Sequence, residues 1–228
     1  MLPCVVLAHD LITAESAQIY LGHAADWHEL AGSAAQRGER AQAYLNIGEM
    51  LDEIRALLNR DLAVHGKVQG LASAYLVAGL ERVGTPLTYS SSRNYFTANS
   101  DYYRMALELG LGEQPAQLAR LGLLRGEFYD NVSGNLLESS LTGQQLEEQI
   151  AVAEALMNDD LSEPDMEETR FIATILFAQA ANAAPHGRQQ SVYRDQALVL
   201  AAEFRRDYPD SLRAAAIEVV RGSLKREP

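Results

Sequence analysis

Histidine and carboxylate side chains occur at two places where their spacing could support chemistry. His23 and His28 are five residues apart in an expected helix, and Asp61 precedes His65 by four residues. Metal ligands on one helical face need steps of three or four residues, so the two histidines should point apart. A surface ion pair or a helix cap explains the spacing of Asp61 and His65 better than catalysis does. We therefore expect no catalytic residue and no metal ligand among them.

Motifs of the common enzyme families are also missing. The chain contains no HExxH, GxSxG, P-loop or GxGxxG sequence. Cys4 is the only cysteine, which excludes an intrachain disulfide and a haem or zinc site built from paired thiols. The acidic stretch 158–165 lacks the spacing and the central glycine of a calcium-binding EF-hand, and its acids suit the start of a helix. The sequence thus predicts a protein that is not an enzyme and needs no cofactor.

The strongest candidate for a binding site is a segment rich in tyrosine and arginine. Four of the ten tyrosines lie within fifteen residues, and two arginines accompany them. These residue types dominate the binding energy of many protein interfaces, because they offer large contact area and hydrogen bonds. The alternative is that the rings fill a groove between helices as core. The candidate partner- or ligand-binding residues are Tyr89, Arg93, Asn94, Tyr95, Tyr102, Tyr103 and Arg104.

The negative charge is concentrated in one stretch of the chain. Residues 126–169 hold twelve acids and no Lys, Arg or His, which accounts for the whole net charge of −12. Nucleic-acid binding needs a basic surface, so we expect no nucleic-acid partner. The acids suit a basic partner or a cation, or they form a solvated face that aids solubility.

The elements that must position these residues are predicted to be helices. Ala and Leu, both strong helix formers, dominate a hydrophobic content of 47%. Apolar residues recur at steps of three and four, and prolines fall between the periodic stretches. The residues from 84 to 100 lack this period. The expected helices cover about 13–35, 39–59, 61–82, 101–111, 115–129, 142–157, 162–184, 191–208 and 211–224.

Short connections between these helices favour an all-α fold of stacked antiparallel hairpins. Residues 11–228 are expected to form a single helical-repeat domain, with possible sub-halves 11–84 and 101–228 joined by the irregular segment 85–100. Residues 1–10 are interpreted as a flexible terminus or as the remnant of a signal peptide. Val6 and Ala8 have the small-residue spacing of a signal-peptidase site, although a basic leader region is missing.

Three short patterns resemble tetratricopeptide repeats. Tyr44-x-x-Ile47-Gly48-x-x-Leu51 is similar to the first helix of such a repeat, and Leu118-x-x-Leu121-Gly122 repeats part of it. Tyr208-Pro209-Asp210-Ser211 resembles the junction between repeats in bacterial cell-envelope proteins. The resemblance implies a right-handed array of about nine helices, in which the glycines let neighbouring helices approach closely.

Arrays of this kind generally bind other proteins. We therefore expect a non-enzymatic scaffold or adaptor that binds a peptide or a partner protein. The alternative is a small-ligand or glycan-binding protein that uses residues 89–104. The resemblance favours the periplasm or cell envelope, with the cytoplasm as the alternative. No apolar run reaches the ~20 residues of a membrane helix, so no membrane span is expected.

Overall fold

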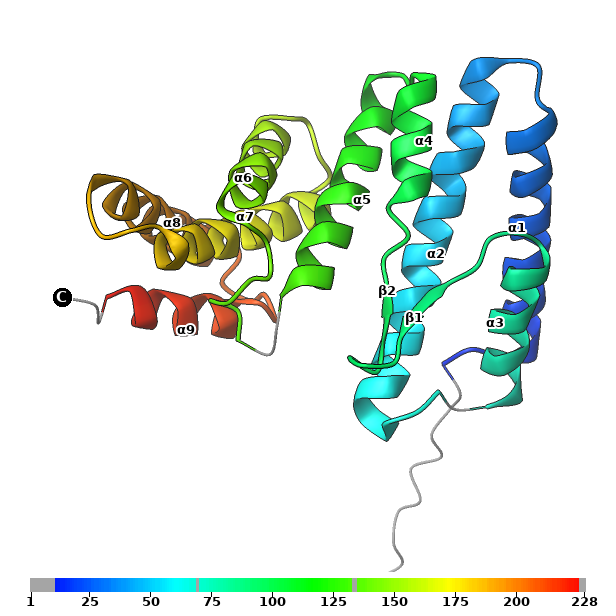
Figure 1. The fold of residues 1–228 in the computed structure, drawn as a ribbon, viewed down its shortest axis with the longest axis horizontal. Coiled ribbons are helices and arrows are strands. Elements are labelled where there is room, and N and C mark those ends of the chain that lie inside the picture. The colour runs from blue at the N-terminus through cyan, green and yellow to red at the C-terminus, as the bar shows by residue number, and fades with distance from the viewer. Residues whose placement is uncertain (1–10, 69, 133–134, 226–228) are drawn as a thin grey trace, which may run out of the picture. The chain divides into compact units, whose positions relative to one another are not determined.

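Helices dominate the fold (Figure 1). The computed structural model describes residues 11–68, 70–132 and 135–225. These ranges contain nine α-helices and one two-stranded antiparallel sheet. The described residues are 74% helical, far above the ~30–35% of an average soluble domain, so the predicted all-α class is confirmed. The suggested signal remnant 1–10, including Cys4, lies outside the described residues. In the ranges that are described, no helix is both long and apolar enough to cross a membrane.

The chain divides into two compact units, residues 1–122 and 123–228. The boundary falls inside helix α5 (Glu113–Asn131). The segment 85–100, which we considered as the link between two halves, instead belongs to the first unit. Its residues pack on α2, which explains why it does not separate the halves.

Helix α2 is the centre of the first unit and contacts α1, α4 and β2. Ile47, Leu51, Ile54 and Leu58 recur along it at helical spacing, and each is at most 2% exposed. Burial of such a stripe is the main stabilising force of an amphipathic helix. The helices of this unit are α1 (Ala14–Ser33), α2 (Arg37–His65), α3 (Leu71–Arg82) and α4 (Asp101–Leu109).

The predicted break between two helices near residue 60 is wrong, because α2 continues to His65. Asp61 does not start a helix. It lies buried inside α2, 3.8 Å from the His65 ring nitrogen. The helix ends at Gly66, which has φ +70° and donates its N–H to the Leu62 carbonyl. Glycine adopts this left-handed conformation without the cost that a Cβ imposes.

The segment expected to be irregular forms a β-hairpin. Strands β1 (Thr88–Ser90) and β2 (Tyr95–Thr97) pair in antiparallel register, with Tyr89 opposite Phe96. Phe96 is 5% exposed and joins a core to which α1, α2 and α3 contribute. The hairpin is thus fixed to the helices by one buried ring.

Helix α7 is the centre of the second unit. All residues from Phe171 to Ala181 are buried, because α6, α8 and α9 pack around this helix. Two predicted helix starts are confirmed here: Thr142 and Gln145 form a capping box, and Ser162 caps α7 by accepting the Asp165 N–H. The starts predicted at 191 and 211 are displaced, because α8 begins at Arg188 and α9 at Ala214. The helices are α6 (Gly143–Met157), α7 (Glu163–Ala183), α8 (Arg188–Asp207) and α9 (Ala214–Leu224).

The two glycines of the repeat-like patterns make room for one aromatic ring. A Cβ added at Gly48 would lie 2.9 Å from the Tyr103 ring, and one at Gly122 only 2.3 Å from it. Tyr103 itself is 2% exposed and donates its hydroxyl to Asp52 at 2.8 Å. We expected these glycines to serve close approach of helices. They instead accommodate a buried tyrosine from α4.

Candidate functional site

The Asn59 side chain holds the hairpin to α2, because it forms the two backbone hydrogen bonds that a neighbouring strand would form with β2. The Asn59 amide donates to the Phe96 carbonyl at 2.8 Å and accepts the Phe96 N–H at 2.7 Å. Both backbone groups of Phe96 therefore point away from β1. In an antiparallel pair, the residue opposite such a position also directs its N–H and C=O outward. Tyr89, the partner of Phe96, thus presents its backbone groups at the free edge of β1.

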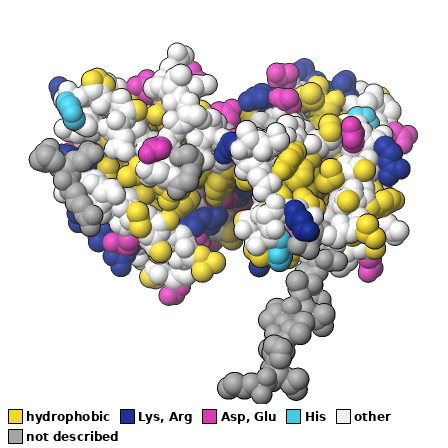
Figure 2. Space-filling model, turned by 60° about the horizontal axis from the view of Figure 1, so that its bottom comes forward, with side chains coloured by type: hydrophobic (Ala, Val, Ile, Leu, Met, Phe, Trp, Pro, Cys, Tyr) yellow, Lys and Arg dark blue, Asp and Glu magenta, His cyan; other side chains and the backbone are white. Residues whose placement is uncertain are grey.

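A pocket of about 420 Å³ lies beside this strand. Its walls come from the end of α2, the α2–α3 connection, α3 and the hairpin, and most of them are apolar. We call it the β1 groove; its described lining residues are Leu62, Gly66, Lys67, Val68, Val77, Leu87, Tyr89, Asn94 and Phe96. On the face of this unit turned forward in Figure 2, hydrophobic side chains gather with Lys or Arg side chains close by. Lys67 is the charged residue among those lining the groove.

Tyr89 and Asn94, two of the predicted site residues, form the polar rim of the groove. The Tyr89 hydroxyl donates to the Asn94 side-chain oxygen at 2.6 Å, and the Asn94 amide donates to the Gly66 carbonyl at 3.2 Å. Asn94 has φ 48°, a left-handed conformation that asparagine tolerates better than most residues. The Tyr89 ring lies against Phe96, yet the residue stays 47% exposed. The rim is thus ordered before any ligand arrives.

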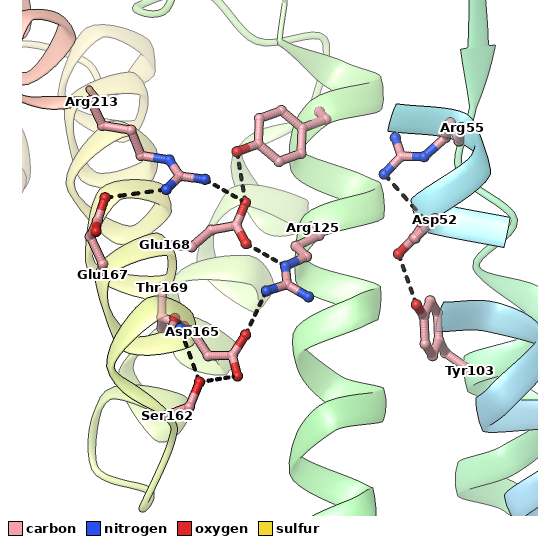
Figure 3. Close-up of polar contacts among 11 residues, drawn as sticks. Asp52, Arg55, Tyr103, Arg125, Ser162, Asp165, Glu167, Glu168, Thr169 and Arg213 are labelled. Carbon is pink, nitrogen blue, oxygen red and sulfur yellow. Dashed lines mark hydrogen bonds and ion pairs between the residues drawn. The ribbon is translucent and has the colours of Figure 1, made fainter. Parts of the chain in front are cut away.

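Arg93 and Tyr95 lie in the same hairpin but do not line the groove. The Arg93 guanidinium stacks on the Tyr95 ring at 5.3 Å from its centroid. The Tyr95 hydroxyl accepts a hydrogen bond from the buried Arg55 at 3.2 Å. Arg55 also pairs with Asp52, as Figure 3 shows. These contacts hold the first residue of β2 against α2.

The other three predicted residues lie on α4, and two of them are core. Tyr102 and Tyr103 are 9% and 2% exposed, so their rings have no surface to offer a partner. The Tyr102 hydroxyl donates to the Gly84 carbonyl, and burial raises the pKa of this tyrosine. Arg104 is exposed and pairs with Asp101 one helical turn away. Tyr102 and Tyr103 are therefore core residues and not binding residues, because they lie on the apolar face of α4 that packs inward.

The second unit holds a connected set of charges. Arg125 donates to both Asp165 and Glu168, and Arg213 donates to both Glu167 and Glu168 (Figure 3). The Tyr129 hydroxyl also donates to Glu168, and burial together with the Glu168 charge raises the pKa of Tyr129 to about 12. The acids at the start of α7 thus balance two arginines from outside the acidic stretch. This arrangement connects α5, α7 and the start of α9.

A smaller pocket of about 160 Å³ also lies in the second unit. Glu147, Gln189 and Tyr193 meet at its edge, where the tyrosine and the glutamine both donate to the carboxylate. The described residues of the whole chain include no group of three His, Cys, Asp or Glu side chains placed to hold a metal ion. His23 stacks on Trp27, and the His28 ring lies against Gly84.

No protein-family model, curated protein or solved structure matches this chain. The site therefore has to be judged from its own geometry. Sequence reasoning found Tyr89 and Asn94 but missed the walls of the groove and Asn59. Gly66 and Gly70, both with positive φ, were the available signal. These glycines lie on either side of the connection between α2 and α3, which places Lys67 and Val68 in the same groove as the hairpin residues.

Proposed function

We propose that this protein is a non-enzymatic interaction module that binds a peptide segment of a partner protein in the β1 groove. The observation that carries the proposal is the combination of apolar walls with a preformed polar rim. A volume of about 420 Å³ falls within the range of ~300–1,000 Å³ that ligand sites occupy. The walls supply burial, while Tyr89, Asn94 and Lys67 supply direction.

The proposal includes a tetratricopeptide-like stacking of the helices. In support, α7 contacts both α8 and α9, and α8 contacts α9. From α6 to α9, each helix thus meets the next along the chain, and α7 also meets the next but one, as in stacked hairpins. The Tyr208–Ser211 junction takes part, since the Ser211 hydroxyl donates to Glu167 of α7.

A small polar ligand such as a glycan is the second candidate for the groove. The hydrogen-bonding side chains of Tyr89 and Asn94 beside the Phe96 ring favour it, because aromatic rings with adjacent amides suit sugar faces and hydroxyls. A peptide fits better, since five of the lining side chains are Leu, Val or Phe. Such walls gain more from burying apolar side chains than from covering hydroxyl groups.

A location in the periplasm or cell envelope is proposed on the resemblance of the Tyr208–Ser211 junction. Fractionation of the natural host tests it. The protein should be released with the periplasmic fraction, with an N-terminus near His9. Protein found only in the cytoplasm with residues 1–8 intact would contradict this location.

The binding proposal is tested by selecting twelve-residue peptides from a random display library against the purified chain. The best peptide is then titrated by calorimetry into three proteins: the natural chain, Lys67→Glu and Val77→Asp. Val199→Asp on α8, where the valine is 51% exposed, is the matched control. We expect both groove variants to weaken binding and the control to bind normally, with unchanged helical content throughout. Peptides that bind all four proteins equally would contradict the proposal. If every selected peptide is displaced from the groove by a glycan, the glycan is favoured as the natural ligand.

A further inference from the structure

We infer that the bound segment is an extended strand that adds to the free edge of β1. This inference rests on the proposed peptide-binding function and specifies how the peptide is held. An extended chain can satisfy a strand edge with its own backbone, while its alternate side chains fill a neighbouring pocket.

The first observation is the set of unpaired backbone groups. The bonds between Asn59 and Phe96 fix which residues of the hairpin face outward, so Tyr89 presents its N–H and C=O at the edge. Leu87 has the same orientation, because strand geometry repeats every two residues. In agreement, the Pro86 carbonyl faces the opposite way and accepts from Asn99. Across the described ranges, the backbone groups of Leu87 and Tyr89 have no hydrogen-bond partner.

The second observation is where this edge lies. Leu87 and Tyr89 line the groove together with Val77 of α3, so the groove borders both β1 and this helix. In Figure 1, β1 is on the side of the hairpin toward α3. A strand in that space would have amide partners on one side and the apolar face of α3 on the other. Its inward side chains would reach Leu62, Val68 and Val77, so aliphatic residues fit them.

The third observation concerns charge and length. Lys67 at the rim favours a carboxylate next to the aliphatic side chain of the peptide. Exposed strand edges usually carry charges that prevent unwanted pairing, but Thr88, Tyr89 and Ser90 are uncharged. The edge offers the hydrogen bonds of only two residues, which suits a short linear segment. The structure thus assigns the groove to an extended peptide with an aliphatic anchor and a neighbouring acid.

Amide hydrogen exchange of the full chain tests the inference, with the library-selected peptide as probe. Saturating peptide should slow exchange at Leu87 and Tyr89 at least tenfold. The Phe96 amide, already bound to Asn59, serves as the internal control and should change little. In parallel, each peptide bond of the probe is N-methylated in turn. Strand addition predicts an alternating pattern, in which every second methyl group weakens binding tenfold or more.

The outcomes separate this inference from the proposed function. If Val77→Asp abolishes binding but Leu87 and Tyr89 stay unprotected and the methyl scan shows no alternation, the peptide occupies the groove without joining β1, and the inference is wrong. If no groove-dependent peptide is found, both fail. If both amides are protected without peptide, and the mass doubles from 25.0 kDa at the same concentration, a second copy occupies the edge and the inference is overturned.

Discussion

In the second compact unit, α7 is covered by three helices and its acids are paired with Arg125 and Arg213, whereas in the first unit the β1 edge keeps unpaired backbone groups beside an apolar groove. Both units bury continuous apolar stripes, so hydrophobic burial alone does not distinguish them. The difference lies in two particular sets of polar groups: the acids at the start of α7 are paired with arginines, whereas the backbone groups at the outer edge of β1 are not paired. The open edge beside the groove is the feature on which the proposed binding role rests.

The comparison also changes the interpretation of the acidic stretch 126–169. Asp165, Glu167 and Glu168 are half-buried and engaged by arginines, so they do not form a freely solvated face. Part of the acidic stretch is therefore structural. Only its remaining acids, such as Glu148 and Glu154 on the exposed side of α6, are placed to attract a basic partner at long range.

The largest expected effect comes from breaking the closed core of the second unit. Phe204 is fully buried, and its ring lies against Phe171 and Tyr208. Phe204→Ala should lower the free energy of unfolding by ~3–5 kcal/mol, because it leaves a cavity that the helices cannot fill. Urea unfolding followed by circular dichroism measures this. Val199→Ala on the exposed side of α8 is the control and should change stability by less than ~0.5 kcal/mol.

A smaller loss is expected where a buried ring of the first unit packs directly against a glycine. Gly122→Ala should destabilise the protein by ~1–3 kcal/mol, since the new methyl group would overlap the Tyr103 ring. Gly22→Ala provides the matched control. That glycine lies in an exposed part of α1 with no atom within 4 Å of an added Cβ, so alanine should stabilise the helix by up to ~1 kcal/mol. Equal effects of the two changes on the melting temperature would show that the Tyr103 ring does not pack tightly against Gly122.

The charge network of the second unit should give a distinct alkaline response. The folded-state pKa of Tyr129 is about 12, against 10.0 in the unfolded chain, so the folded form holds its proton more tightly. Its contribution to stability is complete below pH 10 and declines as the pH rises toward 12, by roughly 2–3 kcal/mol. Tyr129→Phe should flatten that decline in urea unfolding. Part of the decline in stability with pH should remain in this variant, because the pKa of Tyr20 is also raised to about 12. An unchanged slope in Tyr129→Phe would contradict the assigned role of Tyr129.

The smallest effect on overall stability concerns the hairpin. Asn59→Ala removes two hydrogen bonds to Phe96 and should cost ~1–2 kcal/mol, largely as local opening. Amide exchange at Tyr95 and Thr97 should accelerate, while exchange in α7 stays slow. Gln42→Ala on the same helix, which removes an exposed bond to Asn46, is the control and should leave the hairpin unchanged. If Asn59→Ala accelerates exchange in both units alike, the hairpin does not open as a local element.

The helices could be predicted from the sequence because their signals are local. Ser162 before an apolar period of three and four placed the start of α7 correctly. The hairpin could not be predicted in this way, since strands of three residues are too short to show a period of two. The site depended on contacts across the chain. Asn59 and Phe96 are 37 residues apart, and nothing in either neighbourhood indicates that they meet. The burial of Tyr103 likewise follows from packing against Gly48 and Gly122, not from the composition of its segment.

The most direct test of the central claim compares a tyrosine beside each pocket. Tyr89 borders the β1 groove, and Tyr193 borders the smaller pocket of the second unit. The library-selected peptide is titrated by calorimetry into Tyr89→Ala and Tyr193→Ala, after both are shown to melt at the temperature of the natural chain. Loss of a binding hot spot costs ~2 kcal/mol or more, so Tyr89→Ala should raise the Kd by about 30-fold. Tyr193→Ala should leave the Kd unchanged. If the peptide binds Tyr89→Ala with the natural affinity, or if Tyr193→Ala weakens it instead, the β1 groove is not the binding site.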